Sequence, residues 1–197
     1  MKIYLKSCSL FEVKKSLDYR LIDGVYLVSE KEAEPCIAPD SDMSAIIQSM
    51  HGPVFLRAMG ESAEDILEDT RELMKSGPNI VIRIKANLEG FKACSHLAER
   101  DIMVAVDGIE TLAQGVLAAK SGAQYIIFST PVLRTRDKFD SMTMEKCAKL
   151  TRDISPNCQL VAGNISDEDL LNMAIRHGSG ALELSYRQLL KMTDPAR

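Results

Sequence analysis

Short apolar stretches recur along the chain and alternate with longer segments whose apolar positions follow the spacing of an amphipathic helix. The short stretches predict a strand that ends at Lys6 and further strands at residues 24–28, 53–59, 79–87, 102–107, 124–129, 159–163 and 180–184. The longer segments predict helices at residues 9–19, 43–50, 62–77, 88–99, 109–121, 142–154, 166–178 and 186–192. The polar residues 29–42 and 130–140 are expected to form loops.

Local capping chemistry marks the ends of the predicted helices. Ser9-Leu10-Phe11-Glu12 is a capping box, and Gly77, Gly122 and Gly178 each end a helix just before a strand. Strands that alternate with capped helices indicate parallel βαβ units. Eight such units in a single domain, residues 1–197, favour an α/β fold of the (β/α)8 or TIM-barrel type. A doubly wound sheet is the alternative, but residues 6–9 lack the glycine-rich first turn that it needs.

The predicted strand at residues 79–87 carries two cations. Because side chains alternate between the faces of a strand, Arg83 and Lys85 point the same way as Val81, and the intervening isoleucines form an apolar face. Both faces of a helix-covered parallel sheet are normally apolar, so these cations suggest a functional surface.

Composition and charge narrow the function classes. The net charge of −4 and the pI near 5.5 argue against nucleic-acid binding, which needs a basic face. The sequence has no apolar run near the ~18 residues of a membrane span and no signal-peptide pattern, so we expect a cytoplasmic protein that contacts no membrane.

Cysteine and histidine spacing does not indicate a metal site. The five cysteines are scattered without a Cys-x-x-Cys pair, and the three histidines lie far apart, which predicts neither a disulfide framework nor a metal centre. Cys8 ends the first strand; we interpret it as a buried thiol, with a nucleophilic thiol as the less favoured alternative.

The chain resembles the small transaldolases and fructose 6-phosphate aldolases over almost its whole length. The segments that carry the resemblance are Lys2-Ile3-Tyr4-Leu5, Leu21-Ile22-Asp23-Gly24-Val25, Asn79-Ile80-Val81-Ile82, Glu89-Gly90-Phe91-Lys92-Ala93, Ala113-Gln114-Gly115-Val116-Leu117-Ala118-Ala119-Lys120-Ser121-Gly122-Ala123-Gln124-Tyr125 and Gln188-Leu189-Leu190-Lys191. The resemblance implies a class I aldolase barrel that uses a lysine Schiff base without a metal or organic cofactor. It also implies a homo-oligomer, which in the family uses a further helix after the region where this sequence ends.

The resemblance also locates candidate site residues. The family's strand-one aspartate falls at Lys6, and its third-strand glutamine falls at Arg57. Its Schiff-base lysine falls at Arg83, so that Lys85, two residues further on, is the near replacement. The family's Thr-Asn-Pro motif falls at residues 27–29.

The later family motifs are replaced as well. The fifth-strand Asn-x-Thr ends at Asp107 here, and the arginine of the sixth-strand loop falls at Val132, close to Arg134 and Arg136. In the phosphate site of the seventh strand, Asn164 stands for a serine and Ser166 for a basic residue.

Taken in the family's register, six charged residues converge on the interior or mouth of the barrel: Lys6, Arg57, Arg83, Lys85, Asp107 and Glu183. Buried charges need partners, which predicts the pairs Arg83–Asp107 and Lys6–Glu183. The surplus positive charge suits a small anionic metabolite such as a sugar phosphate or keto acid. Neighbouring cations favour the neutral, nucleophilic form of the Lys85 amine. Asp107 would then serve as the acid and base. Lys6 is a second candidate amine.

Two hypotheses follow. The first is a divergent Schiff-base aldolase or transaldolase acting on a phosphorylated sugar or related anionic carbonyl compound. Arg83, Arg57, Lys6, Arg134, Asn164, Ser166 and Glu183 would bind this substrate. The second is a catalytically inactive transaldolase-like barrel that binds an anionic metabolite.

Overall fold

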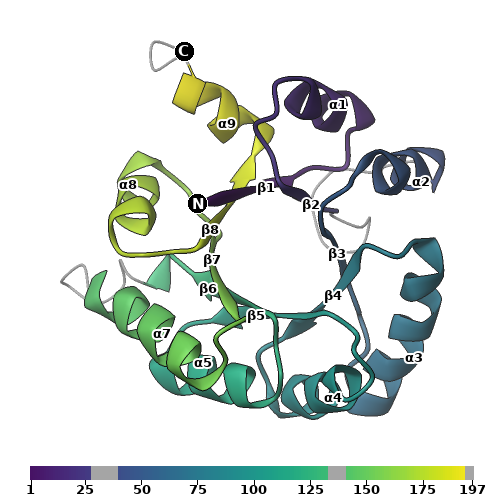
Figure 1. Ribbon diagram of the computed structural model, residues 1–197, viewed down its shortest axis with the longest axis vertical. Coiled ribbons are helices and arrows are strands. Elements are labelled where there is room, and N and C mark those ends of the chain that lie inside the picture. The colour runs from purple at the N-terminus through teal and green to yellow at the C-terminus, as the bar shows by residue number, and fades with distance from the viewer. Residues whose placement is uncertain (28–39, 133–140, 194–197) are drawn as a thin grey trace.

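A closed barrel of parallel strands forms the centre of the molecule, described in a computed structural model over residues 1–27, 40–132 and 141–193 (Figure 1). Each strand pairs with its neighbours in sequence, and β8 pairs with β1 to close the barrel. The strands are β1 (Lys2–Lys6), β2 (Gly24–Tyr26), β3 (Val54–Arg57), β4 (Ile80–Lys85), β5 (Val104–Ile109), β6 (Tyr125–Ser129), β7 (Gln159–Gly163) and β8 (Ala181–Ser185).

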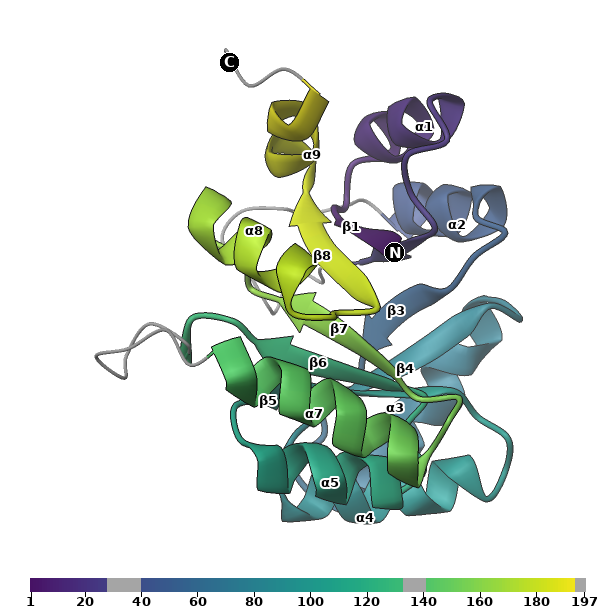
Figure 2. The same cartoon turned by 60° about the vertical axis from the view of Figure 1, so that its left-hand side comes forward.

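Helices surround this barrel on its outer side (Figures 1 and 2). They are α1 (Leu10–Asp18), α2 (Asp40–Ser49), α3 (Ala63–Leu73) with a 3-10 turn (Met74–Ser76), α4 (Leu88–Ala98), α5 (Leu112–Lys120), α7 (Ser141–Ile154), α8 (Glu168–Arg176) and α9 (Tyr186–Thr193). The predicted (β/α)8 barrel is confirmed, and the doubly wound alternative is wrong because an open sheet has no β8–β1 pairing.

Alternation along each strand separates two cores. Residues of one parity point inward, where a buried inner cluster takes one residue from every strand: Tyr4, Tyr26, Phe55, Val81, Ala105, Ile127, Val161 and Ala181. Residues of the other parity, such as Ile80, Ile82 and Ile84, belong to the outer core between strands and helices. The apolar outward face predicted for the fourth strand is therefore confirmed.

Several element boundaries differ from the sequence prediction. β5 runs on to Ile109, where the sequence predicted a helix start, because a register irregularity between Asp107 and Ile109 accommodates Gly108 at a φ of 81°. The helix begins later because Thr111 is the true N-cap, forming a capping box with Gln114. α2 also begins at Asp40, inside the predicted loop.

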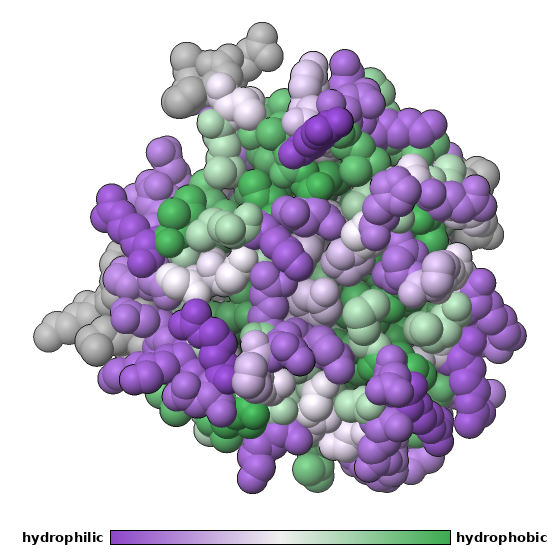
Figure 3. Space-filling model, in the orientation of Figure 1, coloured by the Kyte–Doolittle hydropathy of each residue, from purple (hydrophilic) through white to green (hydrophobic). Residues whose placement is uncertain are grey.

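The surface seen along the barrel in Figure 3 is largely hydrophilic around its rim, with hydrophobic residues visible between α9 and α1. Exposed apolar side chains on these two helices are Phe11, Leu190 and Met192. Among the described residues, no helix is both long and apolar enough to cross a membrane.

Candidate active site at the C-terminal mouth of the barrel

The inward-facing residues near the C-terminal ends of several strands are charged. Arg83 and Lys85 follow Val81 of the inner cluster with the same parity on β4, and Asp107 follows Ala105 on β5. In the same way Glu183 follows Ala181 on β8, and Lys6 follows Tyr4 on β1. The end of a barrel formed by strand C-termini is the functional end in TIM-barrel enzymes, so this charged layer is the candidate site.

The predicted pair Arg83–Asp107 is confirmed. Arg83 Nε and a terminal guanidinium nitrogen donate to the same oxygen, Asp107 Oδ2, at 3.0 and 2.7 Å. The contact runs diagonally between neighbouring strands, because Arg83 lies in register with Ala105 and Lys85 with Asp107. Both side chains are largely buried, with 8% and 14% of their surface exposed. Asp107 thus accepts two charge-assisted hydrogen bonds from a permanently charged group through one oxygen.

The predicted pair Lys6–Glu183 is also confirmed, and its environment is different. Lys6 Nζ lies 3.3 Å from Glu183 Oε1; the lysine side chain is 38% exposed, whereas the glutamate side chain is 4% exposed. Burial raises the pKa of the Glu183 carboxyl above its usual value, although Lys6 and Arg83 act to lower it. Gly163 on β7 makes room for this carboxyl, since a Cβ placed there would lie 3.1 Å from Glu183 Oε2.

Tyr26 of the inner cluster contacts this charged layer, and sequence reasoning missed it. It is fully buried, its ring stacks on Phe55 at 4.1 Å, and the Arg83 guanidinium lies 5.4 Å from the ring centroid. Its hydroxyl has no hydrogen-bond partner among the described residues. Burial, followed by the charge of Glu183, raises the pKa of this phenol well above its usual value. Its strand parity, together with its register opposite Lys6, is the signal that could have found it.

The remaining predicted cations lie nearer the rim. Lys85 is exposed at the end of β4, and Arg57 is half-buried at the end of β3, in register with Arg83. Val132 is the last described residue before the predicted binding residue Arg134, which lies outside the described residues together with Arg136. The described mouth residues therefore keep the predicted excess of cations over carboxylates.

A cavity of about 920 Å³ opens beside this layer, between α8 and α9. It brings together Lys6, Glu183, Asn164 and Ser166, which the sequence had predicted for one site. Sequence reasoning missed Arg187 and Lys191 of α9, although their spacing of four residues places both on one helix face. The other lining residues are Ile165, Asp167, Glu168, Leu171, Asn172, Ile175, Ser185, Gln188 and Met192.

Local caps fix the two helices that bound this cavity. Asp167 accepts hydrogen bonds from the backbone amides of Asp169 and Leu170, both at 3.1 Å, which starts α8. Ser166 donates to the Asp167 carboxylate at 2.7 Å, so its hydroxyl is engaged in the cap. Ser185 caps α9 by accepting from the amide of Gln188 at 3.3 Å.

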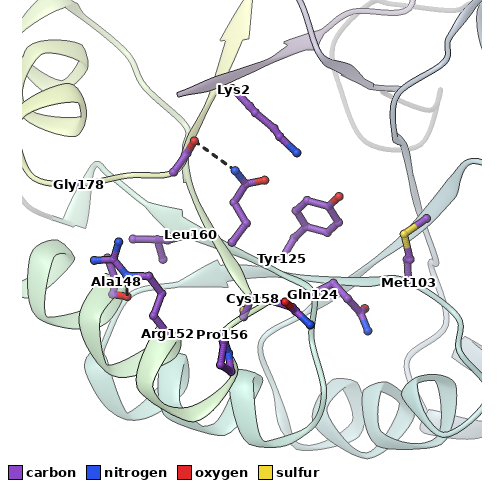
Figure 4. A pocket seen from close by; sticks show the side chains of 13 residues that line it. Lys2, Met103, Gln124, Tyr125, Ala148, Arg152, Pro156, Cys158, Leu160 and Gly178 are labelled. Carbon is purple, nitrogen blue, oxygen red and sulfur yellow. Dashed lines mark hydrogen bonds between the residues drawn. The ribbon is translucent and has the colours of Figure 1, made fainter.

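The opposite end of the barrel holds a second cavity, of about 460 Å³ (Figure 4). Lys2 and Tyr125 line it from the N-terminal ends of β1 and β6, and Arg152 lines it from α7. Beside it, Tyr4 donates to Gln159 Oε1 at 2.7 Å, and Gln159 donates to the Gly180 carbonyl at 3.2 Å. Because this end of a barrel serves stability, we place the site at the other end.

None of the described cysteines lines the cavity beside the charged layer. Cys8 is buried and disulfide-bonded, so the prediction of a thiol at this position is wrong, because sequence spacing does not reveal which side chains the fold brings together. Cys94, Cys147 and Cys158 are buried free thiols whose pKa values burial raises to about 11, 11 and 12. Among the described residues, no group of three side chains is arranged to bind a metal ion.

Comparison with known proteins agrees with this architecture. The family model for Transaldolase/Fructose-6-phosphate aldolase matches residues 34–177. A probable transaldolase 2 of Listeria monocytogenes is 32% identical over 182 residues, covering 90% of this chain and 77% of the relative. A probable transaldolase of Thermodesulfovibrio yellowstonii is 31% identical over 184 residues, covering 93% of this chain and 81% of the relative. The chain therefore belongs to the transaldolase/fructose-6-phosphate aldolase family.

Proposed function

We propose that this protein is a divergent Schiff-base aldolase or transaldolase that acts on a phosphorylated sugar or a related anionic carbonyl compound. The observation that carries the proposal is the charged inner layer at the C-terminal mouth of a family barrel, where lysine amines and carboxylates lie together. Lys85 and Lys6 both belong to the inward-facing parity of their strands and are accessible. A lysine Schiff base supplies the electron sink for carbon–carbon cleavage, so this chemistry needs no metal or organic cofactor.

The charge of the mouth supports an anionic substrate. Asp107 and Glu183 each have a cationic partner, Arg83 and Lys6, whereas Lys85 has no ion pair with any described residue. A phosphate or carboxylate is the ligand class that would compensate the remaining positive charge.

Reductive trapping tests the proposal. The protein is incubated with dihydroxyacetone or fructose 6-phosphate, treated with borohydride, and its intact mass is measured. We expect one covalent adduct per chain that requires both carbonyl compound and borohydride. A mass unchanged under all conditions would refute the Schiff-base chemistry.

A non-catalytic barrel that binds an anionic metabolite is the second candidate, and the Arg83–Asp107 pair favours it. An arginine cannot form a Schiff base, and two hydrogen bonds from Arg83 occupy one oxygen of Asp107. A thermal-shift panel of sugar phosphates and carboxylates tests binding, and this candidate predicts stabilisation without any adduct. Turnover that is lost in Lys85→Met or Lys6→Met would exclude it.

The predicted homo-oligomer and cytoplasmic location stay predictions. Sedimentation of the purified protein tests the first, and fractionation of the cells that make it tests the second.

A further inference from the structure

We propose that Lys6 is the amine that forms the Schiff base and that Glu183 is the acid that completes its formation. The inference rests on the proposed function and assigns its chemistry to Lys6 and Glu183 in place of Lys85 and Asp107, the pair that the sequence favours. The observations that carry it are the direct contact of the two side chains and the cavity of about 920 Å³ that both line.

Geometry separates this dyad from Lys85 and Asp107. Lys6 Nζ is 3.3 Å from Glu183 Oε1, and the amine is partly exposed to the cavity while the carboxyl is enclosed. A reacting lysine needs this combination, because the substrate must reach the amine while its proton-transfer partner stays in place. Asp107 is instead held by two hydrogen bonds from Arg83, which already occupy one of its oxygens.

The electrostatics of Glu183 allow it to hold a proton. The carboxyl faces Lys6 of β1, Tyr26 of β2, Arg83 of β4 and Asp107 of β5. Desolvation is the largest influence and raises the pKa of Glu183. In the proposed step a proton moves from the Lys6 ammonium to Glu183 across their 3.3 Å contact, which turns the ion pair into a neutral amine beside a neutral acid.

This neutral pair has the groups that imine formation requires. The Lys6 amine attacks the substrate carbonyl carbon, forming a C–N bond and, after proton transfer from nitrogen to oxygen, a neutral carbinolamine. Glu183 then gives its proton to the carbinolamine hydroxyl, the C–O bond breaks, and water leaves. The products are a protonated Schiff base on Lys6 and the Glu183 carboxylate, so the original ion pair is restored around the intermediate. No oxidant, metal or further reactant is needed.

An independent feature points to a ligand at this place. Tyr26 lies in register with Lys6 on the neighbouring strand, and its buried hydroxyl lacks a partner among the described residues. Buried hydroxyls are nearly always hydrogen-bonded, so this donor is available to a water or ligand oxygen. A side chain at Gly163 would meet Ile127 Cγ2 at 2.5 Å and Glu183 Oε2 at 3.1 Å, so β7 needs glycine where it passes this carboxyl.

Peptide mass spectrometry after borohydride trapping with dihydroxyacetone tests the inference. We expect the adduct on Lys6. Lys6→Arg should abolish it while keeping the melting temperature, because arginine preserves the positive charge opposite Glu183 but forms no Schiff base. The matched control is Lys2→Arg, at the other end of the same strand face, which should keep the full adduct (Figure 4).

Glu183→Gln tests the acid. The amide keeps the shape of the side chain but cannot give up a proton, so we expect trapping to slow about 100-fold or more. In the wild type the trapping rate should fall as pH rises through the pKa of Glu183, and this dependence should be absent in Glu183→Gln.

Three outcomes would each refute a different part of these proposals. An adduct on Lys85 would refute the assignment to Lys6 and leave the proposed function standing. An adduct on Lys6 that forms equally fast in Glu183→Gln would refute the role of Glu183. The absence of an adduct on any lysine would refute the proposed function and this inference together.

Discussion

Removal of Arg83 is the most direct test of the buried charge network. Arg83→Met replaces the guanidinium with an apolar side chain and leaves the Asp107 carboxylate, 14% exposed, without its hydrogen bonds at 3.0 and 2.7 Å. Loss of one partner of a buried ion pair costs about 3–5 kcal/mol, because the remaining charge stays desolvated. For a chain of this size we expect the melting temperature to fall by about 6–20 °C.

The assay is a double-mutant cycle followed by urea unfolding. Arg83→Met and Asp107→Leu are measured singly and together, and the double variant should recover most of the loss, because no unpaired charge remains in the core. The loss of the contact between Arg83 and Tyr26 is common to the single and double variants, so the cycle cancels it.

The exposed pair Lys92–Glu64 provides the matched control. Its nitrogen–oxygen distance of 2.8 Å is close to the 2.7 Å of Arg83–Asp107, but its side chains are 49% and 72% exposed. Lys92→Met should therefore change stability little, since solvent screens such pairs. If Arg83→Met were no more destabilising than Lys92→Met, the argument that burial makes the pair essential would be refuted.

Two further predictions concern the buried groups beside the pair. Tyr26→Phe should raise the free energy of unfolding by about 1–3 kcal/mol, because it removes a buried hydroxyl without a described partner; a loss of stability would mean that the hydroxyl is satisfied in solution. Glu183, facing Lys6, Tyr26, Arg83 and Asp107, has a raised pKa, so the folded state holds a proton that the unfolded chain has released. Relative to Glu183→Gln, the wild type should therefore lose stability as pH rises through the raised pKa of Glu183 and regain it as pH falls toward the ordinary glutamate pKa. Parallel urea-unfolding profiles of the two proteins would contradict this.

Much of the barrel could be predicted because its signals are local. Capping residues and strand periodicity depend on neighbours within a few positions, so alternation alone placed Arg83 and Lys85 on one face of β4. The family register then predicted that this face is the inner one. The boundary errors have local causes too. Gly108 extends β5 through an irregular register, and Thr111 starts α5 later than the apolar pattern suggests.

The site could be predicted only in part, because reactivity depends on burial and on contacts between distant segments. Sequence and family register gave both ion pairs, yet they gave no sign that Lys6 borders a cavity while its partner Glu183 is enclosed. They also favoured Lys85 with Asp107, a carboxylate that Arg83 occupies in the folded chain.

The sequence by itself determined the alternation of elements, the parity of each strand residue and the excess of cations at the mouth, because these follow from the order of side chains along the backbone. Only the tertiary structure decided which charges are desolvated and which reach a cavity. Closure of β8 on β1 brings Glu183 beside Lys6 across more than 150 residues of chain, and the pairing of β2 with β1 sets Tyr26 in register with Lys6. Desolvation belongs to that assembled surface, and it distinguishes a possible acid from a structural carboxylate.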